Sequence, residues 1–127
     1  KKMNTPDNLL YTEDHEWAKY GNDNVTIGIT DFAQSQLGDV IFVELPDVGE
    51  EFNAGDIFGE IEAVKTVSEL FIPISGTISA VNEDLENLPD KVNSDPYNEG
   101  WLIKITPSDP DEKDELMNFL SYEEFVS

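Results

Sequence analysis

The sequence predicts a mainly β fold with one short internal helix and helices near the C-terminus. Short runs in which apolar and polar residues alternate recur along the chain, and clusters of Gly, Asn, Asp and Pro separate them. After residue 108 the apolar residues recur at helical spacing instead. With 127 residues, of which 39% are hydrophobic, the chain is long and apolar enough for one domain with a modest core.

The N-terminal part is predicted to be a polar segment followed by a β-hairpin. Residues 1–8 are polar and are expected to be mobile, ahead of a single domain over 9–127. Residues 15–29 alternate on both sides of the turn cluster 21–24, which predicts two paired strands. Trp17 is expected in the core.

A short helix and a third strand are predicted next. Residues 30–38 have the signals of a helix that a glycine ends, and Asp31 and Gln34 have the spacing of a capping pair. Residues 40–45 alternate as a strand does, and Pro46 closes that strand.

A central hairpin follows, with its tip at Lys65-Thr66. Its first strand covers 57–64, with Ile57 expected on the same face as Ile61, and its second covers 67–73. The remaining predicted elements are a strand over 77–82, a short helix or turn over 83–88, an extended loop over 92–97 and a final strand over 100–105.

The C-terminal segment 109–126 is predicted to be helical. Asp109 and Pro110 have the types of an N-cap and a first helical residue. Ser121, with Glu124 three residues later, matches a second capping box and predicts a second helix start.

The charge and the lack of cysteine exclude several classes of function. The net charge is −21 and every cation is a lysine, so neither nucleic acid nor an anionic membrane is an expected partner. No disulfide, thiolate metal site or cysteine nucleophile can form, and no metal site is expected. Residues 1–4 carry no secretory or presequence signal, which predicts a bacterial cytoplasmic protein, or a mitochondrial matrix protein if processed.

Lys65 is the residue that the pattern singles out. It is the only cation between Lys19 and Lys91, and Glu60 and Glu62 precede it closely. A lysine is a flexible stem that ends in a nucleophilic amine, and acylation removes its charge. An isolated amine between two strands therefore indicates an attachment point, with an ordinary solvated lysine as the alternative.

Six separate segments, spread over roughly residues 9–125, carry motifs of one protein family. They are YTEDHEW (11–17), IGITDFAQ (27–34), LGDVIFVELP (37–46), EAVK (62–65), VNSDPY (92–97) and GWLIKI (100–105). In this order and at this spacing they resemble the glycine cleavage system H-protein family. The family's usual stretch Glu-Ser-Val-Lys-Ala is Glu62-Ala63-Val64-Lys65-Thr66 here.

The resemblance implies a fold and a function. The fold is the barrel-sandwich hybrid of lipoyl and biotinyl carriers, and lipoic acid is held in amide linkage on Lys65. The chain is then a carrier and not an enzyme, moving the aminomethyl group of glycine between enzymes. The implied partners are the pyridoxal-phosphate glycine decarboxylase (P-protein), the tetrahydrofolate-dependent aminomethyltransferase (T-protein), lipoamide dehydrogenase (L-protein), and a lipoate ligase or a lipoyl or octanoyl transferase.

The resemblance also implies a cleft that shelters the loaded arm. Glu16 borders it, where an anionic carboxylate would hold an aminomethyl ammonium by a charge-assisted hydrogen bond. Asp14, Glu62 and Glu69 are the further candidates for this cleft. His15 is expected to have a structural role, because its neighbours in the sequence face other ways along a strand.

Three alternatives stay open at this point. Other carriers fit less well, because a Pro/Ala-rich linker is absent and no Met flanks Lys65, as would be usual in 2-oxoacid dehydrogenase lipoyl domains and biotin carriers respectively. An H-like relay that donates lipoyl to other enzymes has the same motifs. An unmodified acidic interaction module would share the charge but leave Lys65 free.

Overall fold

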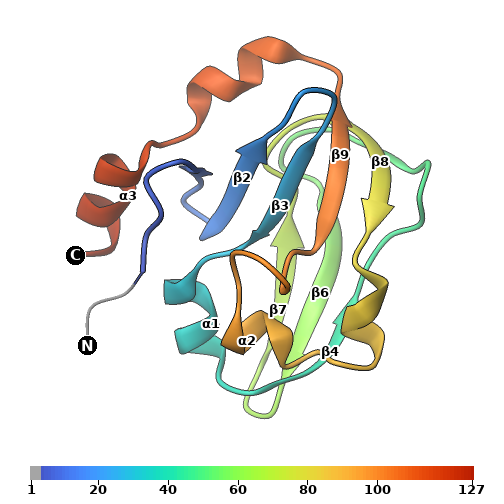
Figure 1. The fold of residues 1–127 in the computed structure, drawn as a ribbon, viewed down its shortest axis with the longest axis vertical. Coiled ribbons are helices and arrows are strands. Elements are labelled where there is room, and N and C mark those ends of the chain that lie inside the picture. The colour runs from blue at the N-terminus through green and yellow to red at the C-terminus, as the bar shows by residue number, and fades with distance from the viewer. Residues whose placement is uncertain (1–3) are drawn as a thin grey trace.

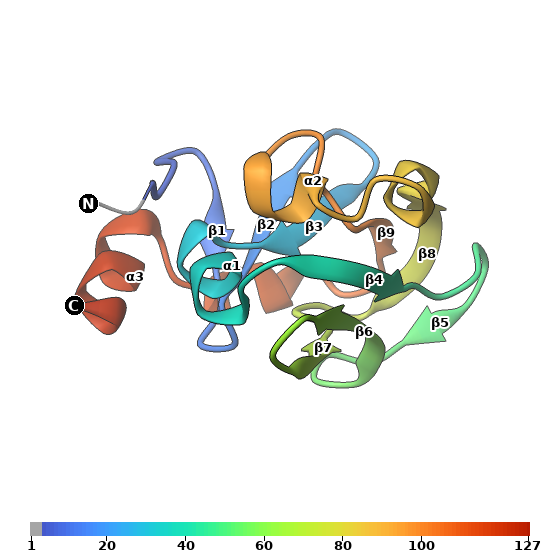
Figure 2. The ribbon, with the colours of Figure 1, turned by 90° about the horizontal axis from the view of Figure 1, so that it is seen from below.

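Two antiparallel sheets form the body of the protein in the computed structural model, which describes residues 4–127 (Figures 1 and 2). One sheet has the strand order β1 (Leu10–Tyr11), β2 (Glu16–Tyr20), β3 (Val25–Ile29), β9 (Ile103–Pro107), β8 (Gly76–Val81) and β5 (Glu51–Phe52). The other has the order β4 (Val40–Glu44), β6 (Ile57–Ala63) and β7 (Val67–Phe71). The mainly β prediction is confirmed.

Five short helical segments connect and flank these sheets within the described residues. They are α1 (Asp31–Leu37), η1 (Glu83–Glu86), α2 (Lys91–Ser94), η2 (Pro110–Glu115) and α3 (Phe119–Val126), of which η1 and η2 are 3-10 helices. In the part of the chain that the structure describes, no helix is long and apolar enough to cross a bilayer.

The main core lies between the two sheets. Ile27 of β3, Ile61 of β6 and Ile78 of β8 are almost fully buried in one apolar cluster. Since burying each such side chain contributes about 2 kcal/mol, this contact holds the three-stranded sheet in place. A second cluster packs α3 against β1, where Tyr11 and Tyr122 stack with their ring centroids 4.6 Å apart.

The predicted alternation in β6 is wrong at its start. A register shift between Ile57 and Gly59 turns Phe58 into the core, where it is 4% exposed, while Ile57 is 50% exposed. The cause is a close approach of two backbones, because a Cβ on Gly59 would collide with the Glu44 carbonyl oxygen. A bulge lets the strand continue past this contact.

The helix α1 forms where it was predicted, but its cap is one residue earlier than the predicted pair. Thr30 is the N-cap, and its Oγ1 accepts a hydrogen bond of 3.1 Å from Ala33 N. Asp31 and Gln34 do bond, from Gln34 Nε2 to Asp31 Oδ1 at 2.7 Å, but both lie inside the helix. Gly38 ends α1 with φ of +81°, a conformation that suits glycine.

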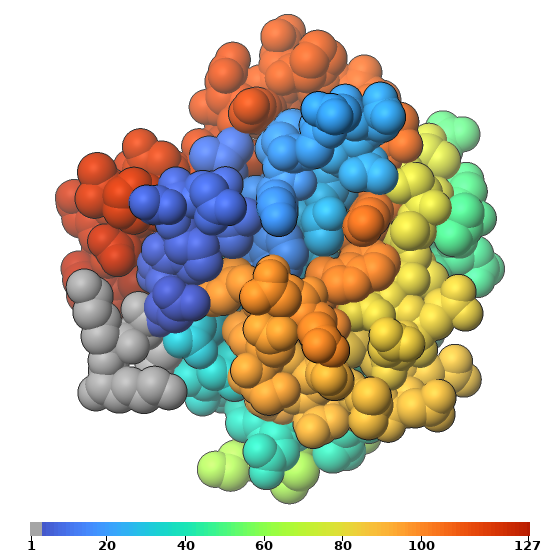
Figure 3. All heavy atoms as spheres, viewed as in Figure 1, coloured from blue at the N-terminus to red at the C-terminus, as the bar shows by residue number. Residues whose placement is uncertain are grey.

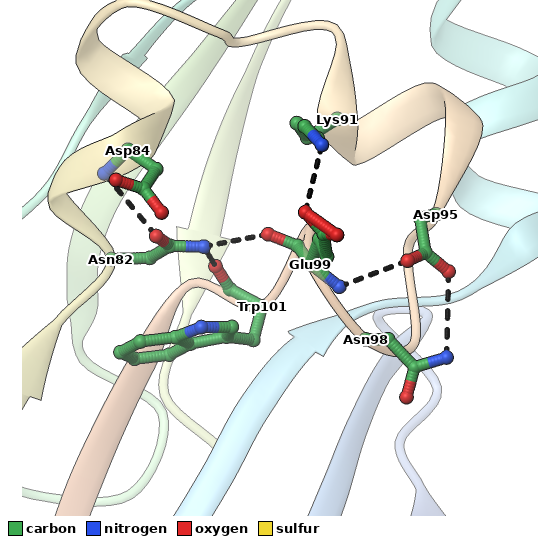
Figure 4. Close-up of polar contacts among 7 residues, drawn as sticks. All are labelled: Asn82, Asp84, Lys91, Asp95, Asn98, Glu99 and Trp101. Carbon is green, nitrogen blue, oxygen red and sulfur yellow. Dashed lines mark hydrogen bonds and ion pairs between the residues drawn. The ribbon is translucent and has the colours of Figure 1, made fainter.

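The segment 92–97 was predicted to be an extended loop, and this is wrong because α2 covers its first half. Polar contacts hold the segment around α2, between Asn82 and Trp101, in place (Figure 4). Asn82, which is buried, donates from Nδ2 to the carbonyl oxygens of Glu99 and Trp101, each at 2.8 Å. Because the carbonyl oxygen of Trp101 accepts from Asn82 and not from a neighbouring strand, β9 begins at Ile103 and not at the predicted residue 100. Trp17 is buried as predicted, whereas Trp101 is only half-buried.

The C-terminal segment is helical in two pieces. Asp109 caps η2 as predicted, because its Oδ1 accepts a hydrogen bond of 3.0 Å from Asp111 N. The predicted capping box at Ser121 is wrong, since α3 already begins at Phe119 with Asn118 as its cap. The preceding residue, Met117, still pairs with Tyr11 in an isolated bridge, so Asn118 is the first residue free to cap.

The predicted mobile segment 1–8 falls in part on residues 1–3, which lie outside the described residues. Residues further along this segment have defined contacts. The carbonyl oxygen of Asn4 accepts from Tyr97 Oη at 2.7 Å, and that of Pro6 accepts from Tyr11 Oη at 2.5 Å. Whether the segment moves stays a prediction.

Candidate functional site

The tip of the β6–β7 hairpin carries Lys65. Ala63 N donates to Thr66 O at 2.8 Å, so Val64 and Lys65 form the turn between the two strands, one residue earlier than the predicted tip at Lys65-Thr66. Lys65 is exposed, and Val64 is 68% exposed. The hairpin tip stands out from the body of the molecule at the bottom of the ribbon and space-filling views (Figures 1 and 3). The structure therefore places the predicted attachment residue where another protein can reach it.

The backbone at this tip is fixed on its inner side as well. Val64 N donates to Asp39 O, in the segment before β4, at 3.0 Å. None of the residues with positive φ in the described chain lies in the tip, so Lys65 needs no strained conformation. A rigid platform then carries a flexible side chain, and a partner that binds the tip has little backbone to order.

The outer face of the three-stranded sheet is acidic next to the tip. Phe42, Glu62 and Val67 are cross-strand neighbours on this face, and all three are exposed. The next row along the strands consists of three carboxylates, Glu44, Glu60 and Glu69. Glu62 thus lies on the outer face, close to Lys65 in the sequence.

A pocket of about 300 Å³ opens beside the edge strand β7. One wall is α1, which contributes Phe32 and Leu37, and another is the β7 segment with Ser68 and Glu69. Asp14, His15 and Glu16 form a third side, so the structure brings Asp14, Glu16 and Glu69 together as predicted candidates, whereas Glu62 is not part of the lining. Ser68 follows Lys65 by three residues, which is roughly 10 Å of extended strand.

Glu16 is the buried member of this group, with 2% of its surface exposed. Its Oε2 accepts a hydrogen bond of 2.9 Å from Phe71 N, at the open edge of β7, and Thr12 Oγ1 lies 3.5 Å from its Oε1. Burial raises the pKa of Glu16 to about 8, although the Phe71 N–H opposes that shift. At neutral pH Glu16 is mostly protonated, so the exposed Asp14 and Glu69 supply the negative charge of the pocket.

His15 has the structural surroundings that were expected. Its Nδ1 lies 2.8 Å from Tyr122 Oη, which lies 2.8 Å from Thr30 Oγ1, the N-cap of α1. Its ring packs against Phe32 with centroids 4.8 Å apart, and burial lowers its pKa. His15 therefore ties α3 to the start of α1 beside the pocket.

Two parts of the pocket were missed from the sequence. The first is the α1 wall, although Ala33, Gln36 and Leu37 have the three- and four-residue spacing of one helix face and could have been found that way. The second is the bond from Phe71 N to Glu16, which joins the two sheets across 55 residues of chain and leaves no local signal.

Comparison with known proteins gives one consistent result. The family model for the glycine cleavage H-protein matches residues 9–127. The glycine cleavage system H protein of Salinibacter ruber is 56% identical, over 96% of this chain and 98% of that protein. The one from Bacillus licheniformis is 54% identical, over 98% of both.

A solved structure agrees with these sequence matches. The crystal structure of a glycine cleavage system H protein from Mycobacterium marinum superposes with a TM-score of 0.87 at 39% identity, covering 94% of this chain and 96% of that one. The barrel-sandwich hybrid fold is thereby confirmed. The chain belongs to the glycine cleavage H-protein family, whose members are non-catalytic carriers that hold lipoic acid on a lysine.

Proposed function

We propose that Lys65 is the lipoyl attachment residue of this carrier. The observation that carries the proposal is the place of Lys65 at an exposed hairpin tip whose backbone is held by hydrogen bonds. The other described lysines lie within strands or helices and not at a tip: Lys19, Lys91, Lys104 and Lys113.

The alanine at position 63, where the family usually has serine, is compatible with modification. Ala63 is 4% exposed and faces the core, opposite Val40 of β4. The missing hydroxyl is therefore not part of the surface that a modifying enzyme meets beside Lys65. The exposed groups there are Glu62, Val64 and Thr66.

The lipoyl group supplies two-electron thiol–disulfide chemistry when it is attached, and the protein supplies its position. The partners that follow are the P-, T- and L-proteins of glycine cleavage, and a lipoate ligase or a lipoyl or octanoyl transferase. The relatives named above are bacterial proteins, which supports a cytoplasmic location.

Intact mass tests the proposal. The purified protein, incubated with a lipoate ligase, ATP and lipoate, is expected to gain a single lipoyl increment. Proteolytic mapping should place that increment on the peptide with Lys65. A protein that stays folded and gains no mass, or that is modified at another lysine, would contradict the proposal.

The pocket beside β7 is proposed to shelter the cationic end of a loaded arm. Asp14 and Glu69 are exposed carboxylates at its rim, and Phe32 and Leu37 form its apolar wall. An ammonium between such groups gains charge-assisted hydrogen bonds, and the apolar wall excludes water from the bond to be protected. Glu16 holds β7 against this pocket through Phe71 N.

Neutralising the rim is expected to shorten the life of the loaded form. In the double variant Asp14→Asn, Glu69→Gln, spontaneous loss of the aminomethyl group should be about tenfold faster, since one charged hydrogen bond contributes ~1.5 kcal/mol. A time course of intact mass without T-protein measures this rate. The matched control is Glu83→Gln, Glu86→Gln, which removes the same charge from η1, away from the pocket. Equal rates in the two double variants would rule out the shelter.

A further inference from the structure

Asn93 of α2 makes three hydrogen bonds to the end of α1 and the start of β4. Its Nδ2 donates to Gly38 O at 2.8 Å and to Gln34 Oε1 at 3.1 Å. Its Oδ1 accepts from Val40 N at 2.9 Å. Both amide hydrogens and the carbonyl oxygen are thus used, which fixes the orientation of the side chain.

These contacts lie on both sides of Asp39. Asp39 belongs to neither α1 nor β4, and its own N–H takes part in no ladder, although Gly38 N still donates to Gln34 O at the end of α1. Asp39 O is the acceptor for Val64 N, and Val64 immediately precedes Lys65. Asn93 therefore holds the residues on either side of Asp39, and Asp39 in turn bonds the hairpin tip through Val64 N.

The same amide also holds the pocket wall. Gly38 is the C-cap of α1 and Gln34 lies one turn before it, and the turn between them contributes Gln36 and Leu37 to the lining of the pocket. The segment that bonds the tip and the helix that walls the pocket are thus both bonded by one side chain, which is itself not part of the pocket lining.

We propose that Asn93 is a positioning residue, which sets the backbone before Lys65 in a fixed relation to the α1 wall of the pocket. This inference rests on Lys65 being the attachment residue. Loss of the amide should leave Asp39 free to shift, so Val64 N loses a constant acceptor. The tip then samples several conformations, and a modifying enzyme must order it on binding.

Amide hydrogen exchange of the unmodified protein, followed by NMR, reads the tip directly. In Asn93→Ala the Val64 amide should exchange at least about tenfold faster, while Ala63, whose acceptor Thr66 O lies within the hairpin, changes much less. Asn98→Ala is the matched control, because Asn98 is exposed, lies four residues after α2, and its side-chain amide bonds only the side chain of Asp95, at 3.4 Å. If Val64 exchanges equally in both variants, the proposal is wrong.

Lipoylation kinetics give the second measurement. The KM of a lipoate ligase for Asn93→Ala should rise about tenfold with kcat preserved, because the cost falls on binding. Ile105→Val, which trims the core in β9, controls for stability, and an equal rise in KM at an equal loss of Tm would overturn the positioning role. Asn93→Asp keeps the acceptor for Val40 N but loses both donors, and it serves in place of Asn93→Ala if that variant fails to fold.

The two proposals fail in different ways. If the wild-type protein is not lipoylated at Lys65, the attachment proposal fails, while Val64 exchange still reports on Asn93. If the wild type is lipoylated and the Asn93 variants match it in both exchange and KM, only the positioning role fails.

Discussion

Replacement of Lys65 by arginine is expected to abolish carrier activity and leave the fold unchanged. The side chain is exposed at the hairpin tip, so its substitution should change the free energy of unfolding by no more than about 0.5 kcal/mol. Arginine keeps the positive charge, which preserves the electrostatics of the tip. Its guanidinium stays protonated and offers no amine for acylation. Carrier activity should therefore be lost completely, because the variant has no amine to acylate and not because it fails to fold.

Two measurements check this expectation. After treatment with ligase and lipoate, Lys65→Arg should show no lipoyl increment, and glycine-dependent release of carbon dioxide with the P-, T- and L-proteins should fall to background. Lys19→Arg, at an exposed position on β2, is the matched control and should behave as wild type in both assays. A lipoyl increment on Lys65→Arg would show that another lysine is the attachment residue.

Glu16→Gln is expected to stabilise the protein at alkaline pH. The pKa of Glu16 is raised from 4.5 to about 8 in the folded state, chiefly by burial, so folding favours its protonated form. The contribution of Glu16 to the free energy of unfolding is therefore fully present below pH 4.5 and is lost as the pH rises through 8. Glutamine has the same shape and still offers an oxygen to Phe71 N, but it never ionises.

The difference between the two proteins should follow that titration. At pH 8.5 we expect Glu16→Gln to be more stable than wild type by on the order of 3 kcal/mol, and the difference should vanish near pH 4.5. Urea unfolding at pH 4.5, 6.5 and 8.5 measures it. Glu62→Gln, which removes an exposed carboxyl on the outer face, is the matched control for the loss of one acidic side chain. Parallel stability curves for Glu16→Gln and wild type would refute the role of burial.

The sequence predicted those features that depend on neighbouring residues. Lys65 falls in the turn because the runs on either side of it alternate as strands do, although Val64 and Lys65 form that turn, one residue before the predicted Lys65-Thr66. Thr30 and Gly38 bracket α1 in the same local way. The attachment candidate could therefore be found before the fold was known.

The features that were missed depend on distant partners. Ile57 lies outside the core because Gly59 meets the backbone of Glu44 in another strand. The helix α2 is too short to show a period, and Asn93 finds its partners more than fifty residues away in the chain. Glu16 is buried and Asp14 is exposed, and because both are acidic, residue type alone could not predict which of the two is buried.

The row of Glu44, Glu60 and Glu69 bears on how this carrier behaves when it is abundant. Like charges directly opposite on neighbouring strands repel, so the row costs some stability within one molecule. Between molecules, Glu44 and Glu69 place charge on the two edge strands β4 and β7, and charged side chains on an edge strand disfavour pairing with a strand of another chain. Two copies that meet by this face are expected to repel one another, which disfavours self-association at high protein concentration.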